Sequence, residues 1–221
     1  MSAIDCLRIG VIGLGVQGQK HVDCFRAAPN ATVTAICDAN EVLLNERSAQ
    51  YGVEAAYTDY RALLEQADVD AVSLVLPDHL HRDACEAAFA AGKHVLLEKP
   101  MATTVEDAEA ILAAQKRAGT KLMINWSNRW MPAFASGKAA LDEGRLGDPL
   151  YIYARLSNTL YVPTKMLSWA AGTRLPHWLI CHRFDIARWY LGCEAKRVRA
   201  VCRSRVLRGM GIDTPDFYQA T

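Results

Sequence analysis

A glycine-rich segment near the start of the chain has the residue types and spacing of a phosphate-binding loop. Residues 13–18 read Gly-Leu-Gly-Val-Gln-Gly, follow the aliphatic run Leu7–Ile12 and precede a helical pattern. In such a turn Gly13 permits the tight bend, Gly15 lets the backbone approach a pyrophosphate, and Gly18 lets the helix pack on the strand. The motif alone is a weak signal, but a strand before it and a helix after it predict dinucleotide binding.

An acidic residue lies where such proteins bind the adenosine ribose. Asp38 directly follows the aliphatic run Thr32–Cys37, about 20 residues beyond Gly18. Its carboxylate can accept hydrogen bonds from both ribose hydroxyls and would repel a 2′-phosphate, and no arginine follows at positions 39 or 40. We therefore predict that the cofactor is NAD, with NADP less favoured. The alternative is a solvated carboxylate at a strand end.

The first half of the chain alternates between two periodicities that would position these residues. Short aliphatic or β-branched runs predict strands buried on both faces at Leu7–Ile12, Thr32–Cys37, Ala71–Leu76, His94–Leu97 and Leu122–Asn125. Helical spacing lies between them at Gln17–Ala28, Glu41–Tyr51, Tyr60–Gln66, Arg82–Ala91 and Val105–Ala118. Thr103 with Glu106 predicts a capping box for the last helix, and Gly119 its C-cap. The fold class is therefore α/β, with a doubly wound parallel sheet in an N-terminal Rossmann domain, residues 1–124.

The pattern changes after Asn125. Pro132–Glu143 and Trp178–Leu191 have helical spacing, whereas Pro149–Leu156 and Lys196–Val206 alternate as strands do. These segments predict a second, α+β domain over residues 125–221.

Composition narrows the class of protein. Of 221 residues, 51% are hydrophobic and 22% are charged, which is typical of a globular domain and excludes disorder, collagen and coiled coil. No apolar run approaches the roughly 18 residues of a membrane span, so we expect a cytoplasmic protein without a membrane partner. The seven cysteines show no C-x-x-C pair, which argues against a zinc site.

A basic stretch near the end of the chain raises the question of an anionic partner. Arg197, Arg199, Arg203 and Arg205 would share one face of a strand. No nucleic-acid reading motif accompanies them, so we expect a solvated or subunit-contact face and no nucleic-acid partner.

Further motifs make the sequence resemble the Gfo/Idh/MocA oxidoreductases, which are NAD(P)-dependent enzymes that act mainly on sugars, cyclitols and their derivatives. Besides the glycine loop with His21, they are Pro77 with His81, the run from Gly92 to Pro100, Arg129 with Pro132, and His182-x-x-Asp185. Glu98-Lys99-Pro100 is the most specific element. The resemblance covers essentially the whole chain and implies a Rossmann domain followed by an α/β domain with a large open sheet. It also implies that this sheet is mixed and that the second domain serves substrate binding or oligomerisation.

The resemblance also implies the roles of individual residues. Lys99 would reach the substrate hydroxyl and help to manage its proton, and the bond to Pro100 is often cis in the family. His182 can take an alcohol proton while hydride leaves the same carbon, and Asp185, on the same helix face, could orient it or bind a hydroxyl. The residues themselves allow plainer alternatives, a solvated strand-end lysine and a core histidine paired with Asp185.

The predicted site follows from these roles. Catalytic residues are Lys99, His182 and Asp185, and substrate-binding residues are Lys99, Arg129, Trp178 and His182. Cofactor-binding residues are Gly13, Gly15, Val16, Gln17, Gly18, Asp38, Pro77, His81, Glu98 and Lys99, with His81 on the nicotinamide side. No metal is predicted, because His79 and His81 lack a third ligand.

The sequence departs from the family at one catalytic position. Many members carry an Asp four residues before the catalytic His, where this chain has Trp178. The adjacent His177 points about 100° away on a helix and is no automatic substitute. Three functions therefore stay open: an NAD-dependent dehydrogenase acting on a polyhydroxylated small molecule, a catalytically silent dinucleotide-binding regulatory protein, and an enzyme that recycles bound NAD to cleave glycosides.

The end of the sequence carries one more expectation. Family members run longer and complete a large sheet after the position where this sequence stops, and Asp216–Thr221 looks like the opening of a strand. We expect either a truncated product or an obligate homo-oligomer, with the open sheet as the contact face.

Overall fold

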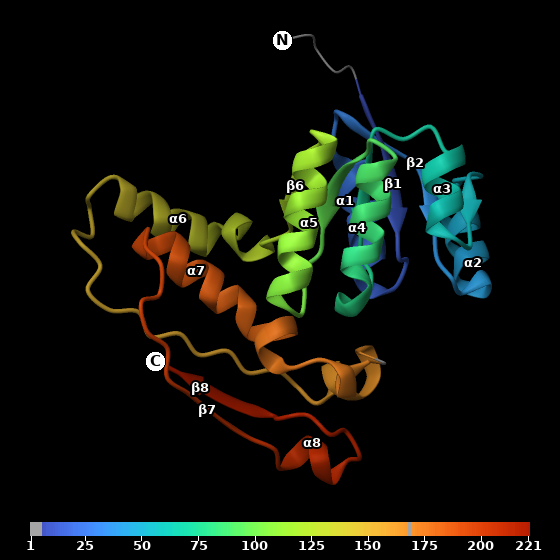
Figure 1. The fold of residues 1–221 in the computed structure, drawn as a ribbon. Coiled ribbons are helices and arrows are strands. Elements are labelled where there is room, and N and C mark those ends of the chain that lie inside the picture. Colours follow the sequence, from blue (N-terminus) through green and yellow to red (C-terminus); the bar gives the residue numbers. More distant parts are fainter. Residues whose placement is uncertain (1–5, 168) are drawn as a thin grey trace. The chain divides into compact units, whose positions relative to one another are not determined.

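The computed structural model describes residues 6–167 and 169–221, and the chain divides into two units between Asn125 and Trp126 (Figure 1). The first unit contains a six-stranded parallel sheet, and the second contains helices and a two-stranded antiparallel sheet. Within the described residues, no helix is long and apolar enough to cross a membrane.

The strands of the first unit are ordered β3-β2-β1-β4-β5-β6. Their bounds are β1 (Leu7–Ile12), β2 (Ala31–Cys37), β3 (Ala56–Tyr57), β4 (Ala71–Leu74), β5 (His94–Leu97) and β6 (Leu122–Ile124). The strand order reverses between β1 and β4, which is the topological switch point of a doubly wound fold. The predicted Rossmann fold is confirmed, with β3 as an added edge strand too short to give a periodic signal.

Helices cover both faces of this sheet. They are α1 (Val16–Ala27), α2 (Glu41–Tyr51), α3 (Tyr60–Gln66), α4 (His81–Ala90) and α5 (Val105–Ala118). Val11 belongs to a buried cluster with Val22 of α1 and Leu44 of α2, whereas the next residue, Ile12, belongs to a cluster with Leu63 of α3 and Ile111 of α5. Because side chains alternate across a strand, successive residues of β1 thus serve the cores on opposite faces.

The ends of α5 show which local signals are reliable. Its N-cap is Thr104, whose hydroxyl accepts a hydrogen bond from the Asp107 backbone N–H at 3.1 Å. The predicted capping box with Thr103 at the cap is therefore wrong by one residue. Gly119 does end the helix in the left-handed conformation, with φ at 66°, as predicted.

The second unit contains fewer regular elements. They are α6 (Pro132–Asp142), α7 (Cys181–Leu191), α8 (Val206–Gly209), β7 (Ala200–Arg203) and β8 (Phe217–Ala220). Short turns of 3-10 or π type are η2 (Ser127–Trp130), η3 (Val162–Met166), η4 (Ala170–Gly172) and η5 (Pro176–Ile180). The Tyr190 hydroxyl of α7 donates a hydrogen bond to the Phe134 carbonyl of α6 at 2.7 Å, and this bond joins the two helices.

Two predicted strands in this unit need correction. Residues 149–159 form no regular structure, and Tyr151 and Tyr153 are 79% and 75% exposed. The alternating pattern of Pro149–Leu156 is compatible with a strand, but a strand also needs a neighbouring strand to which it can hydrogen-bond. Among the described residues, no strand pairs with this segment. The predicted strand Lys196–Val206 shortens to β7, which pairs with β8.

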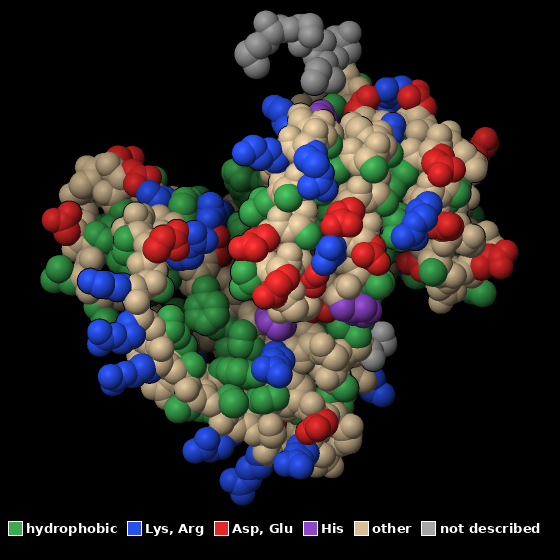
Figure 2. Space-filling model, in the orientation of Figure 1, with side chains coloured by type: hydrophobic (Ala, Val, Ile, Leu, Met, Phe, Trp, Pro, Cys, Tyr) green, Lys and Arg blue, Asp and Glu red, His purple; other side chains and the backbone are tan. Residues whose placement is uncertain are grey.

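The predicted arginine face shortens with that strand, since only Arg203 of the four arginines lies in β7. Arg199 instead exchanges two backbone hydrogen bonds with Thr221, at 2.7 and 2.8 Å. Basic side chains still gather on the surface of this unit, as Figure 2 shows.

Candidate active site

Parallel strands bring several predicted site residues to one edge of the first unit. The phosphate loop follows β1, Asp38 follows β2, and Glu98 and Lys99 follow β5. Open α/β sheets bind ligands at the carboxyl ends of their strands, near the switch point. The first unit therefore assembles its predicted cofactor residues through topology alone.

The phosphate loop fits a pyrophosphate. Gly13 has φ at 93°, and a Cβ on it would overlap the Val75 carbonyl, while a Cβ on Gly18 would overlap the Gly13 carbonyl. A Cβ on Gly15 would meet nothing within 4 Å, so this residue faces open space. Gly15 caps α1 without a side chain, and no acidic residue lies in the first turn, so the positive end of the helix dipole is free to attract phosphate.

Asp38 has a second role that sequence reasoning missed. One carboxylate oxygen accepts a hydrogen bond from the Leu14 backbone N–H at 2.8 Å, and the other accepts one from the Asn40 N–H at 2.9 Å. Asp38 thus ties the phosphate loop to the end of β2. Each oxygen keeps a further acceptor position, so the half-buried carboxylate can still bind a ribose diol.

Glu98 is the centre of a buried polar network. One carboxylate oxygen lies 3.0 Å from His21 Nε2 and accepts a hydrogen bond from Asn125 Nδ2 at 2.7 Å. The other oxygen accepts the Lys99 backbone N–H at 3.1 Å. Burial acts to raise the pKa of Glu98, but the hydrogen bonds from His21 and Asn125 and the charge of Lys99 outweigh it, so the pKa is lowered. The carboxylate is ionised at neutral pH.

His81, predicted to contact the nicotinamide side of the cofactor, lies inside the protein. It is 1% exposed, with Nδ1 2.8 Å from the Pro100 carbonyl and Nε2 3.0 Å from the Leu76 carbonyl. Burial lowers the pKa of its imidazole. His81 therefore connects the loop after β4, which contains Pro77, to the loop after β5; its contact with a cofactor stays a prediction. The Lys99-Pro100 bond is cis, as the resemblance implied.

The second unit pairs two of its predicted site residues with each other. Arg129, in η2, donates from Nε and a terminal nitrogen to the two oxygens of Asp185, at 2.8 and 2.6 Å. Asp185 is 3% exposed, and the Arg129 guanidinium lies 5.5 Å from the centre of the Trp189 ring. The carboxylate expected to orient His182 or bind a hydroxyl is therefore held by Arg129 on both oxygens.

His182 lies one turn before Asp185 on α7 and meets a different partner. Its ring stands edge-on to Trp126, with centroids 6.4 Å apart and an interplanar angle of 80°. Trp126 contacts His182, and Arg129 contacts Asp185 three residues further along both segments. These two contacts hold one face of α7. Trp178 lies half-buried in η5, directly before this helix. Lys99 belongs to the first unit and His182 to the second.

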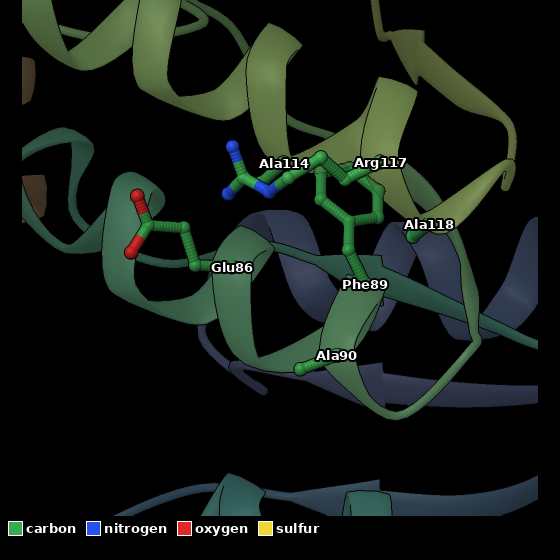
Figure 3. Close-up of a pocket in the computed structure, with 6 residues that line it drawn as sticks. All are labelled: Glu86, Phe89, Ala90, Ala114, Arg117 and Ala118. Carbon is green, nitrogen blue, oxygen red and sulfur yellow. The ribbon is translucent and has the colours of Figure 1, made fainter.

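A surface pocket of about 310 Å³ lies in the first unit (Figure 3). Its lining comes from the last turns of α4 and α5: Glu86, Phe89, Ala90, Ala114, Arg117 and Ala118. Those helix ends lead into β5 and β6, so the pocket lies at the amino edge of the sheet, opposite the phosphate loop. Among the residues that the structure describes, no group of three or more His, Cys, Asp or Glu side chains could hold a metal ion.

Comparison with protein families matches both units. Residues 7–126 match a model described as an oxidoreductase family with an NAD-binding Rossmann fold, and residues 134–221 match the GFO/IDH/MocA C-terminal domain. The first unit is therefore an NAD-binding domain.

Individual relatives are named dehydrogenases. The chain is 34% identical to inositol 2-dehydrogenase 1 of Saccharopolyspora erythraea, over 87% of the chain and 56% of the relative. It is 32% identical to levoglucosan dehydrogenase of Pseudarthrobacter phenanthrenivorans, over 88% and 53%. The structure of scyllo-inositol dehydrogenase from Lactobacillus casei with bound NAD(H) and scyllo-inositol superimposes with a TM-score of 0.87 at 26% identity, over 97% of this chain and 65% of that one. The chain thus spans little more than half the length of these curated relatives.

Proposed function

Since this chain belongs to the Gfo/Idh/MocA oxidoreductase family, we propose that it transfers a hydride between NAD and a secondary alcohol carbon of a sugar, cyclitol or related polyhydroxylated molecule. The observation that carries the proposal is the arrangement at one sheet edge: a loop that fits a pyrophosphate, Asp38 for the ribose and Lys99 two residues beyond β5. The names of the relatives, inositol and levoglucosan dehydrogenases, support the substrate class.

The chain's own residues would handle the hydroxyl proton. NAD bound at this edge supplies the hydride acceptor. In the proposed mechanism the Lys99 ammonium binds the substrate hydroxyl, and His182 takes its proton, because imidazole is the side chain best suited to accept a proton near neutral pH. The Arg129–Asp185 pair fixes the helix that carries His182, so Asp185 acts by positioning rather than by contact with substrate.

Two side chains of the second unit would bind the rest of the substrate. Arg129 has five N–H donors and gives two to Asp185, which leaves donors for a substrate hydroxyl. Trp178 offers an aromatic face to the C–H face of a sugar or cyclitol ring. Trp178 also supports a second candidate function, a silent dinucleotide-binding regulator, since the family resemblance implies a catalytic Asp at this position.

A substrate panel separates these functions. Inositols, aldoses, anhydro sugars and sugar acids would be incubated with protein and NAD, with NADH absorbance and substrate consumption both recorded. Net NADH release with at least one compound supports the dehydrogenase. Glycoside cleavage without net NADH release would indicate NAD recycling, and NAD binding without turnover of any compound would indicate the silent regulator. Either of these two results overturns the proposal.

The proposal extends to assembly and location. Both strands of the small sheet in the second unit are largely exposed, which supports contact with a second copy of the chain through β7 and β8. Light scattering in dilute solution tests this, since a stable 24.4 kDa monomer with low dye binding to apolar surface would exclude an obligate oligomer. A cytoplasmic location stays a prediction.

A further inference from the structure

Glu98 and its partners His21 and Asn125 form the Glu98 network. This network lies in the half of the sheet opposite the half suited to the adenosine of a dinucleotide. A Rossmann sheet consists of two mononucleotide-binding halves that meet at the switch point between β1 and β4. Asp38 follows β2 in one half and is suited to the adenosine ribose. Glu98 follows β5 and Asn125 follows β6 in the other half. The nicotinamide half of the dinucleotide therefore belongs on the side of Glu98.

The contacts of Glu98 require a negative charge. Asn125 Nδ2 and the Lys99 backbone N–H are donors and point at different oxygens, at 2.7 and 3.1 Å. His21 Nε2, 3.0 Å from the first oxygen, lies 3.3 Å from the same Asn125 nitrogen. A carboxylate that accepts several donors is stabilised in its ionised form. The side chain is only 12% exposed, so water screens this charge weakly.

His21 need not cancel the charge of Glu98. Its other ring nitrogen, Nδ1, lies 2.8 Å from the hydroxyl of Ser73, which is fully buried. A hydroxyl can donate a hydrogen bond as well as accept one. If Ser73 donates to Nδ1 and Nε2–H donates to Glu98, a neutral imidazole satisfies its contacts with Ser73 and Glu98, Asn125 Nδ2 donates to the carboxylate instead of to the ring, and the network carries one net negative charge. The cation next to it is Lys99, whose charge helps to lower the pKa of Glu98.

We propose that Glu98 is a fixed negative charge beneath the nicotinamide half of the site that makes this chain bind NAD⁺ more tightly than NADH. The oxidised nicotinamide ring carries a positive charge and the reduced ring carries none, so a nearby carboxylate stabilises only the oxidised form. Glu98 thereby favours loading of the protein with NAD⁺ and release of NADH. This role goes beyond the proposed function, because it concerns the cofactor alone and needs no substrate.

The test is the ratio of two dissociation constants, Kd for NADH over Kd for NAD⁺, measured by calorimetry without substrate. Glu98→Gln keeps the shape of the side chain and removes the charge, and the ratio should fall roughly tenfold, as expected for loss of a weakly screened charge near the ring. Asn125→Ala is the matched control, because it removes a donor from the same carboxylate without changing formal charge. Its ratio should stay within about twofold of the wild-type ratio.

Two outcomes overturn the proposal. One is an unchanged ratio in Glu98→Gln with a normal unfolding transition. The other is an equal fall of the ratio in Asn125→Ala, which would show that the network acts through shape rather than charge. Neither outcome depends on turnover, so failure here differs from failure to find a substrate.

A second variant covers the case in which Glu98→Gln does not fold. Lys99→Met removes the neighbouring cation and leaves the Glu98 contacts to the Lys99 backbone in place. The ratio should then rise by about threefold, the opposite sign to Glu98→Gln. A fall in the ratio in this variant also overturns the electrostatic account.

Discussion

The two units of this chain hold their polar residues in different ways. In the first, buried polar groups such as His21, Ser73 and His81 have partners on other strands, helices and loops built around one continuous sheet. In the second, the described contacts centre on a few pairs, above all Arg129 with Asp185, while Leu150 and Tyr151 are 95% and 79% exposed. A regular sheet positions many side chains at once, whereas an irregular unit depends on each pair separately.

The largest expected effect is a loss of kcat, with little change in NAD affinity, when a proton-handling residue of either unit is removed. Lys99→Ala should lower kcat by roughly 10²- to 10⁴-fold, the range for loss of a group that handles a proton, while NAD affinity changes only a few fold. His182→Ala, in the second unit, should lower kcat similarly and flatten the basic limb of the pH profile. Steady-state kinetics and calorimetry measure both. Normal kcat in Lys99→Ala would remove Lys99 from the mechanism, and the exposed Lys116→Ala provides the control.

Adding one methyl group to the phosphate loop tests how tightly the first unit is packed there. Gly13→Ala should cost about 3 kcal/mol or more of unfolding free energy, because the new Cβ overlaps the Val75 carbonyl and the backbone is left-handed there. Gly15→Ala meets open space, so we expect an unchanged unfolding transition but weaker NAD binding. Denaturant unfolding and calorimetry distinguish the two. A Gly13→Ala protein as stable as wild type contradicts the packing described for this loop.

The second unit should be sensitive at its central ion pair. Arg129→Ala leaves the buried Asp185 carboxylate without its partner and should lower the unfolding free energy by about 2–3 kcal/mol. The double variant Arg129→Met with Asp185→Leu should recover most of that loss, because apolar side chains can replace a buried pair. Arg188→Ala, on the same helix as Asp185, breaks an exposed pair with Glu194 beyond the helix end and should have a much smaller effect. Equal losses for Arg129→Ala and Arg188→Ala would refute the special weight given to the buried pair.

Two substitutions of Asp38 separate its proposed selection of the cofactor from its hydrogen bond to the phosphate loop. Asp38→Asn keeps an oxygen for the Leu14 N–H but removes the charge, so affinity for NADP relative to NAD should rise about tenfold. Asp38→Ala removes both roles and should also weaken NAD binding itself. Calorimetry with both cofactors decides this. Equal binding of NAD and NADP by the wild-type chain would show that Asp38 does not select the cofactor.

The smallest effect is the dependence of stability on pH. The pKa of Glu98 is lowered by folding from its ordinary value of 4.5. Its contribution to stability is therefore fully present above about pH 4.5 and is lost as pH falls through the folded-state pKa. The difference in unfolding free energy between wild type and Glu98→Gln should be constant from pH 5 to 7 and shrink below pH 4.5. A difference that grows towards acid would mean that folding raises this pKa.

Periodicity predicted the first unit well because its strands are buried on both faces and its helices are amphipathic. Leu7–Ile12, Glu41–Tyr51 and Val105–Ala118 match the observed elements at both ends. The strand predicted at Pro149–Leu156 was wrong because alternation shows what a segment can do, whereas pairing depends on a neighbour distant in the chain.

The site shows the same limit. Residue types and spacing predicted the phosphate loop and Asp38 as elements of a dinucleotide site. They did not reveal the bond from Leu14 to Asp38 or the pairing of Arg129 with Asp185, because those partners are 24 and 56 residues apart and meet only in the folded chain.

The bracing of the phosphate loop affects the thermodynamics of cofactor capture. The Gly13 N–H donates to the Cys37 carbonyl at 2.8 Å and the Leu14 N–H donates to Asp38, so bonds within the protein itself hold the loop in a conformation that fits a pyrophosphate. Fixing a residue costs about 1–2 kcal/mol of backbone entropy, and here that cost falls on folding rather than on association. The cofactor meets a preorganised cradle, and its binding free energy is spent on the dinucleotide instead of on ordering the chain.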